Sequence, residues 1–119
     1  MLIKRKRVYD PVQEGDGLRV LVDKTWPHGI EKGELPFAYW AKELTPSDEL
    51  RELYQQNNFA NWDLFTQKYR EELQHSPAIS SFVKQVKDTG VMTITLLYSA
   101  TDDDRNHAVV LQDFLSSYL

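Results

Sequence analysis

The most strongly apolar stretch of this 119-residue sequence is Val91-Met92-Thr93-Ile94-Thr95-Leu96-Leu97-Tyr98. Successive side chains of a strand point to opposite faces of its sheet, and here apolar residues fall on both sets of positions. A strand of this kind is buried on both faces, as in parallel sheets that are covered on both sides. We therefore predict a central strand over residues 91–98.

Segments nearer the N-terminus predict further strands of the same sheet. Residues 4–8 read as a first strand, and residues 18–23 as a second one with the apolar run Val20-Leu21-Val22. Residues 39–44 are interpreted as a short third strand in preference to a helical turn. The alternation of strands and helices predicts a single α/β domain over residues 1–119, with a mostly parallel sheet of three to four strands flanked by helices.

Capping residues and helical spacing predict four helices. Thr45-Pro46-Ser47-Asp48 opens a helix that runs to about Gln56, and Asn58 is a candidate cap for the next one. A third helix begins at Ser76-Pro77 and ends near Gly90, and the last runs from about residue 104 to residue 118. The second helix carries an aromatic and apolar face formed by Trp62, Phe65, Tyr69 and Leu73.

Composition excludes several classes of function. The chain has 18 acidic and 14 basic residues, so its net charge of -4 gives no overall attraction to nucleic acid. It has no cysteine, which excludes disulfides, thiolate catalysis and cysteine-ligated zinc. Charges at Lys4–Arg7 replace the apolar part of a secretory signal, and no run is long enough to span a membrane. We expect a cytoplasmic protein without membrane contact or cofactor, and predict no particular oligomeric state.

Two apolar runs break abruptly into polar clusters, one over residues 20–29 and the other over residues 96–107. If both runs are parallel strands, both clusters lie at carboxyl ends of strands, where open α/β sheets bind their ligands. Tyr98 and Ser99 end the second run, and Asp102, Arg105 and Asn106 follow at the predicted helix start. Free N–H groups in a first helical turn attract anions. The alternative is that the aspartates only cap the helix.

Asp23 and His107 are the candidate catalytic residues of these clusters. Histidine titrates near neutrality and can serve as a base or a ligand, but His107 can equally cap its turn or pack beneath the sheet. Asp23 either orients a ligand or accepts hydrogen bonds from loop backbone. Trp26 and His28 flank Pro27 and provide a stacking surface and an ionisable group for a ligand, although Trp26 can instead fill a gap under the loop.

The remaining motifs argue against familiar chemistry. Asp23, His28, Asp102 and His107 are metal-ligand types, but no metal-binding spacing links them, so no metal is predicted. The glycines form neither a P-loop nor a dinucleotide fingerprint, and Ser99 lacks the nucleophile elbow of serine hydrolases. The cations Lys4–Arg7 could contact nucleic acid, but a charged edge strand that resists aggregation explains them better.

Several motifs together resemble one bacterial family. They are Lys6–Asp10, Arg19–Asp23 with Trp26, Pro27 and Gly29, Pro46–Ser47 before Leu50–Arg51, the Trp62, Phe65 and Tyr69 helix, Leu96–Ala100, and Asp102 with Asn106–Leu111. These residues look like those of the YeaO-like proteins, a branch of the domain of unknown function 488 family. The resemblance spans about residues 3–119, and it implies an intracellular α/β protein without an established activity.

Departures from the family pattern affect the first polar cluster. The pattern has arginine and leucine after the strand-end aspartate and arginine between the loop proline and glycine, whereas this chain has Lys24, Thr25 and His28. Loss of an always-charged arginine weakens the expectation of a phosphate clamp in this loop. A longer branch of the family carries a cysteine and a histidine near the last strand end, and this chain cannot inherit that chemistry.

We predict that the chain binds a small anionic or nucleotide-like ligand between the two strand-end loops, which leaves open whether it is an enzyme of unknown reaction. Arg105 would receive the anion, Asp23 and His107 would orient it or exchange a proton, and Trp26 would stack on it. The alternative is a nucleic-acid or protein interaction module without catalytic activity, which would use Lys4–Arg7 and exposed aromatic residues.

Overall fold

Four parallel strands form the sheet in the order β1-β4-β2-β3. The computed structural model describes residues 1–31, 33–37, 39–56 and 61–119. The strands are β1 (Leu2–Arg7), β2 (Leu18–Leu21), β3 (Tyr39–Trp40) and β4 (Thr93–Tyr98). This arrangement confirms the predicted α/β class and the central position of β4, and the described sheet is entirely parallel.

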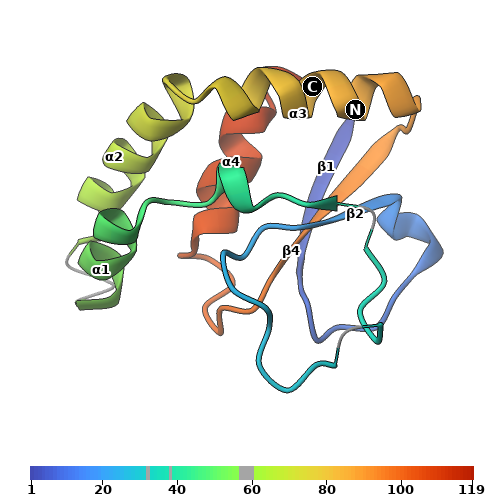
Figure 1. Cartoon of the computed structure of the whole chain (residues 1–119), viewed down its shortest axis with the longest axis horizontal. Coiled ribbons are helices and arrows are strands. Elements are labelled where there is room, and N and C mark those ends of the chain that lie inside the picture. The colour runs from blue at the N-terminus through green and yellow to red at the C-terminus, as the bar shows by residue number, and fades with distance from the viewer. Residues whose placement is uncertain (32, 38, 57–60) are drawn as a thin grey trace.

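Three helices lie between β3 and β4, namely α1 (Asp48–Gln56), α2 (Trp62–Gln74) and α3 (Pro77–Thr89), and α4 (His107–Leu115) follows β4. Two short 3-10 turns are η1 (Glu14–Asp16) and η2 (Lys42–Leu44). Figure 1 shows α3 along the top of the molecule and α2 and α1 descending on its left, whereas the loop after β2 descends on the lower side. None of the helices in the described part of the chain has the length and apolar character needed to cross a membrane.

The two faces of the sheet have different covers. Val20, Val22, Ile94 and Leu96 pack into the main core with the helices. Leu21 and Leu97 alternate with them and pack in a second cluster with Trp26 and Phe37 of the loop between β2 and β3 and with Trp40 of β3. Both covers are needed because these strands are apolar at consecutive positions, as the sequence predicted.

The segment after β3 departs from the predicted third strand over residues 39–44. Only Tyr39 and Trp40 pair with β2, and η2 follows at once. Ala41 and Leu44 are fully buried and three residues apart, which is the spacing at which side chains of a 3-10 turn align. Burial of these two side chains favours the turn over a longer edge strand.

The starts of α1 and α2 also differ from their predicted positions. Ser47 caps α1, because its Oγ accepts the backbone N–H of Leu50, so the helix begins later than the Thr45-Pro46 signal predicted. Asn61 occupies the cap position of α2. The predicted cap Asn58 lies outside the described residues. In α3, the predicted Ser76 cap and the left-handed Gly90 at the other end are both confirmed.

The cations of β1 lie at an edge of the sheet, as predicted, and their side chains are used within the chain. Lys4 donates to the carbonyl oxygen of Gly15, and Arg5 donates to the side chain of Gln112. Arg7 donates to the carbonyl oxygens of Ser99 and Ala100. These contacts anchor β1 to its neighbours.

A buried charge network fixes η1 to the loop-covered face of the sheet. The carboxylate of Asp16 accepts hydrogen bonds from Lys6, Arg19 and the backbone N–H of Gln13, and its residue is only 3% exposed. Burial by itself raises the pKa of Asp16, but the hydrogen bonds from Lys6, Gln13 and Arg19 outweigh it and leave the pKa below the usual 3.8. The ionised form therefore stabilises the fold.

Replacing this carboxylate by Asp16→Asn is expected to lower the free energy of unfolding by about 1.5–3 kcal/mol at pH 7, because hydrogen bonds to a charged group are lost. In the wild type the contribution is complete above about pH 4 and fades as the pH falls through the lowered folded-state pKa. Urea unfolding from pH 7 to pH 2.5 tests this. Parallel stability curves for the two proteins below pH 4 would contradict it.

Candidate functional site

The register of the two central strands places Asp23 beside Ser99. Leu21 pairs with Leu97, and the backbone N–H of Val22 donates to the carbonyl oxygen of Leu97. Two residues beyond that pair, the Asp23 carboxylate accepts the backbone N–H of Ser99 through Oδ2 at 2.9 Å. The two polar clusters therefore meet at the carboxyl edge of the sheet, and Asp23 joins them with a direct hydrogen bond.

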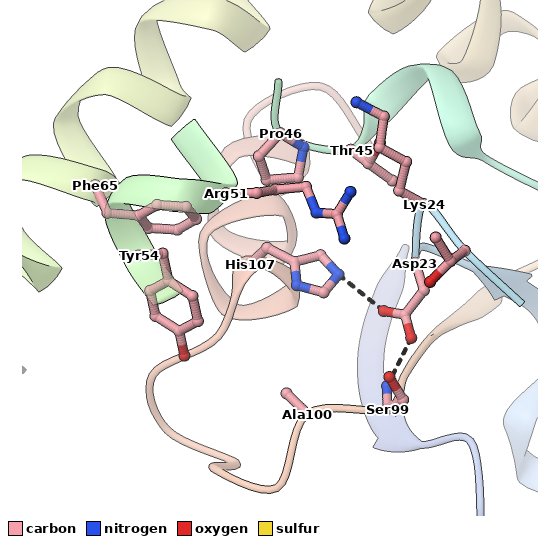
Figure 2. Close-up of a pocket in the computed structure, with 11 residues that line it drawn as sticks. Asp23, Lys24, Thr45, Pro46, Arg51, Tyr54, Phe65, Ser99, Ala100 and His107 are labelled. Atoms are coloured by element: carbon pink, nitrogen blue, oxygen red, sulfur yellow. Dashed lines mark hydrogen bonds and ion pairs between the residues drawn. The ribbon is translucent and has the colours of Figure 1, made fainter. Parts of the chain in front are cut away.

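His107 completes this group from the first residue of α4. Its Nε2 lies 2.8 Å from the carbonyl oxygen of Val22 and 3.1 Å from Oδ1 of Asp23 (Figure 2). Both neighbours are acceptors, so Nε2 carries a proton, and its hydrogen bond goes to Val22. Oδ1 is buried without a hydrogen bond of its own among the described residues and is held by the nearby imidazole alone. Nδ1 is then the remaining polar atom of the ring.

A cavity of about 230 Å³ lies against this pair. Figure 2 shows Asp23 on one side of the imidazole and Tyr54 with Phe65 on the other side. Strand ends, the segment before α1, α1 itself, α2 and α4 all contribute to it. Its lining residues are Asp23, Lys24, Thr25, Thr45, Pro46, Arg51, Tyr54, Phe65, Ser99, Ala100 and His107.

Two cations are among the residues that line the cavity. Lys24 continues the chain directly after Asp23, and Arg51 reaches in from α1 (Figure 2). Both contact the carboxylate of Asp48, at 2.8 Å from the lysine Nζ and 3.6 Å from the arginine. The Asp48 side chain is 83% exposed, and the hydrogen bond from Lys24 lowers its pKa. The exposed carboxylate of Asp48 therefore already neutralises part of the positive charge of Lys24 and Arg51.

The segment before α4 differs from the predicted helix start near residue 104. Oδ1 of Asp102 accepts the backbone N–H groups of Asp104 and Arg105, and this local turn replaces the first helical turn. Asn106 then caps α4 by accepting the N–H of Val109, and its residue is fully buried. Asp102 thus stabilises the turn, and Asn106 caps the helix. Arg105 precedes the helix and is not among the residues that line the cavity.

Three other predicted site residues lie outside the cavity lining. Tyr98 is buried and donates to Asp103, and burial together with that hydrogen bond raises its pKa to about 12. Trp26 packs against Phe37 and Trp40 beneath the loop. His28 is exposed on the same loop. The structure thus brings together Asp23, Ser99 and His107 from the predicted set.

Sequence reasoning missed the helical side of the site. Arg51 and Tyr54 lie on α1 and Phe65 lies on α2, and no site residue was predicted on either helix. A signal for Arg51 was present, because Leu50–Arg51 is part of the motif that carries the family resemblance. Nothing in the spacing of Tyr54 or Phe65 distinguishes a cavity wall from an ordinary core face.

The predicted metal-ligand types do not converge. Asp23 and His107 meet, but within the described parts of the chain no three histidine or acidic side chains come close enough together to hold a metal ion. His28 and Asp102 are not among the residues that line the cavity.

Comparison with known proteins places this site in a family. Residues 2–119 match the family described as the inactive DUF488-N3 subclade. The chain belongs to that subclade. It is 42% identical over 118 residues to the uncharacterized protein YeaO of Escherichia coli (strain K12), covering 98% of this chain and 99% of that protein. The YeaO-like resemblance predicted from the motifs is thereby confirmed.

Other relatives of this chain come from mycobacteria. The chain is 38% identical over 114 residues to the uncharacterized proteins Rv3073c of Mycobacterium tuberculosis (strain ATCC 25618 / H37Rv) and Mb3100c of Mycobacterium bovis (strain ATCC BAA-935 / AF2122/97). Each alignment covers 96% of this chain and 93% of the relative. No solved structure matches the chain.

Proposed function

We propose that this protein binds a small anion in the cavity at the carboxyl ends of β2 and β4 and does not transform it. The observation that carries the proposal is that Lys24 and Arg51 both line a cavity whose floor is the Asp23 and His107 pair. Lys24 belongs to the first polar cluster of the sequence. Arg51 takes the role of anion receptor that the sequence assigned to Arg105.

Electrostatics of the lining favour a negatively charged ligand over a neutral or positive one. Asp23 is the only carboxylate among the described residues that line the cavity, and it directs Oδ2 at the N–H of Ser99 and has Oδ1 buried against the imidazole. Its charge is thus engaged inside the wall, whereas the side chains of the two cations are each 34% exposed. Arginine in particular offers paired N–H groups that match a carboxylate or phosphate.

Size and family support a small ligand and a binding role. A cavity of about 230 Å³ is smaller than the roughly 300–1,000 Å³ typical of drug-sized ligand sites, which favours a small anion over a nucleotide. The description of the subclade as inactive favours binding over turnover. The Asp23 and His107 pair then serves to hold the floor of the cavity in one shape.

Titration with sodium acetate and with inorganic phosphate, followed by amide NMR, tests the proposal. Ser99 donates its N–H to Asp23, so its amide signal should report any change at the cavity floor. We expect saturable shifts at Ser99 and His107 with at least one of the two anions. Shifts that are absent, or that grow linearly with salt and scatter over the surface, would overturn the proposal.

Asp48→Asn is expected to strengthen anion binding by up to about fivefold. The change removes the internal carboxylate that contacts both Lys24 and Arg51, and exposed ion pairs of this kind are worth about that much. The same titration measures it. The matched control is Asp88→Asn, which breaks an exposed pair with Lys84 on α3 and should leave the affinity unchanged. Weaker binding by Asp48→Asn would contradict the prediction.

A further inference from the structure

The cavity has two chemically different sides. The cations Lys24 and Arg51 stand on one side, and the aromatic rings of Tyr54 and Phe65 stand on the other, across the imidazole of His107 (Figure 2). Tyr54 and Phe65 contact each other with ring centroids 4.9 Å apart, so they form a continuous aromatic wall. A ligand that fills this space meets charge at one end and rings at the other.

On the aromatic side, the Tyr54 hydroxyl already donates to the carbonyl oxygen of Arg105. With its proton on Nε2, His107 has only an acceptor, Nδ1, as its remaining polar atom. A tetrahedral oxyanion such as phosphate has acceptor oxygens on every side. The oxygens that face the rings would give up their hydrogen bonds to water and find no donors in the protein to replace them. A carboxylate has its oxygens at one end only, so the rest of the molecule can be apolar.

We propose, on the basis of the function proposed above, that the ligand is a small aromatic monocarboxylate. Its carboxylate is held by Arg51 and Lys24, and its ring packs against the wall formed by Tyr54 and Phe65. Aromatic rings gain from such contacts both by leaving water and by tilted or offset packing with other rings. The site then selects its ligand by the combination of one negative charge and one flat apolar body.

Four probes separate these contributions: benzoate, acetate, inorganic phosphate and the neutral benzamide. NMR titration at Ser99 and His107 should give benzoate an affinity about 10–100-fold higher than acetate, from burial of the ring. Benzamide should bind at least tenfold more weakly than benzoate, because it lacks the charge.

Other outcomes overturn the inference in distinguishable ways. If acetate or phosphate binds as tightly as benzoate, the aromatic ligand class is wrong and the anion site stands. If benzamide binds as tightly as benzoate, charge is not recognised, and both proposals are wrong. If none of the four binds, the anion site itself is overturned.

Variants of Tyr54 tie the selectivity to the wall. Tyr54→Leu removes the ring and should reduce the ratio of benzoate to acetate affinity by about fivefold or more. Tyr54→Phe keeps the ring and loses only the hydroxyl bond to Arg105, so it should keep the ratio of the wild type. The ratio is measured within each protein, so a general loss of affinity does not mimic the effect. An unchanged ratio in Tyr54→Leu would overturn the role of the wall.

Discussion

Gly17→Ala is expected to lower the free energy of unfolding by about 2–5 kcal/mol. Gly17 has φ +62°, and a Cβ added there would lie 2.2 Å from the carbonyl oxygen of Thr93 and 2.9 Å from its carbonyl carbon. Backbone strain in this region costs an L-residue about 1–2 kcal/mol, and displacing packed neighbours costs about 1–3 kcal/mol more. The opposing atoms belong to the backbone of the central strand, so they cannot turn aside as a flexible side chain would.

Two other glycines separate the causes of this effect. Gly90 has φ +74° and no atom within 4 Å of an added Cβ, so Gly90→Ala should show backbone strain alone, about 1–2 kcal/mol. A Cβ at Gly15 would meet only the Nζ of Lys4 at 3.3 Å, and Gly15→Ala should be nearly neutral. Urea unfolding of the three variants measures the order. A loss at Gly17 no larger than that at Gly90 would show that the contact with Thr93 carries no cost.

Gly17 also shows why the N-terminal loop is essential to the fold. Immediately before it, Asp16 gathers Lys6 and Arg19 over the loop-covered face, and the hydroxyl of Thr95 donates to the Asp16 carbonyl oxygen. The close approach of Gly17 to Thr93 lets η1 sit directly on β4. From the sequence alone, the segment between the first two strands could be interpreted only as a polar loop, because long-range ion pairs leave no periodic signal.

Local patterns predicted the strands and helices where burial is regular. The apolar run of residues 91–98 correctly indicated a central strand, because two covered faces demand consecutive apolar residues. Ser76 and Gly90 correctly marked the ends of α3. The start of α4 was placed too early because Asp102 forms a local turn that competes with the helix, and only tertiary packing of Asn106 decides between them.

Part of the candidate site could be predicted for a similar reason. Asp23 and Ser99 follow paired strands, so their meeting is a consequence of parallel topology and register. Arg51 could not be found in this way, because its position depends on how α1 packs over the end of the sheet. The sequence left two roles open for Trp26, which are stacking on a ligand and filling a gap under the loop. Its packing against Phe37 and Trp40 favours the second role.

Arg51→Gln is expected to weaken binding of benzoate or acetate by about 10–100-fold. Glutamine keeps much of the side-chain length, but it removes the charge and the paired N–H groups, and a charge-assisted hydrogen bond is worth about 1.5–3 kcal/mol. The Arg51 side chain is 34% exposed, and its ion pair with the exposed carboxylate of Asp48 has an N···O distance of 3.6 Å, so its loss should change the thermal midpoint of the unliganded protein little. NMR titration at Ser99 measures the affinity.

Arg70→Gln is the matched control for this change. Arg70 is similarly exposed, at 38%, and it pairs with Asp113 on α4, outside the cavity lining. The two variants remove the same charge from the molecule, so any effect of net charge on anion affinity is shared between them. A large loss of affinity in Arg51→Gln with little change in Arg70→Gln would therefore come from the cavity itself. Equal losses in both would mean that anions respond to the overall field of the protein, and the cavity would lose its role as the binding site.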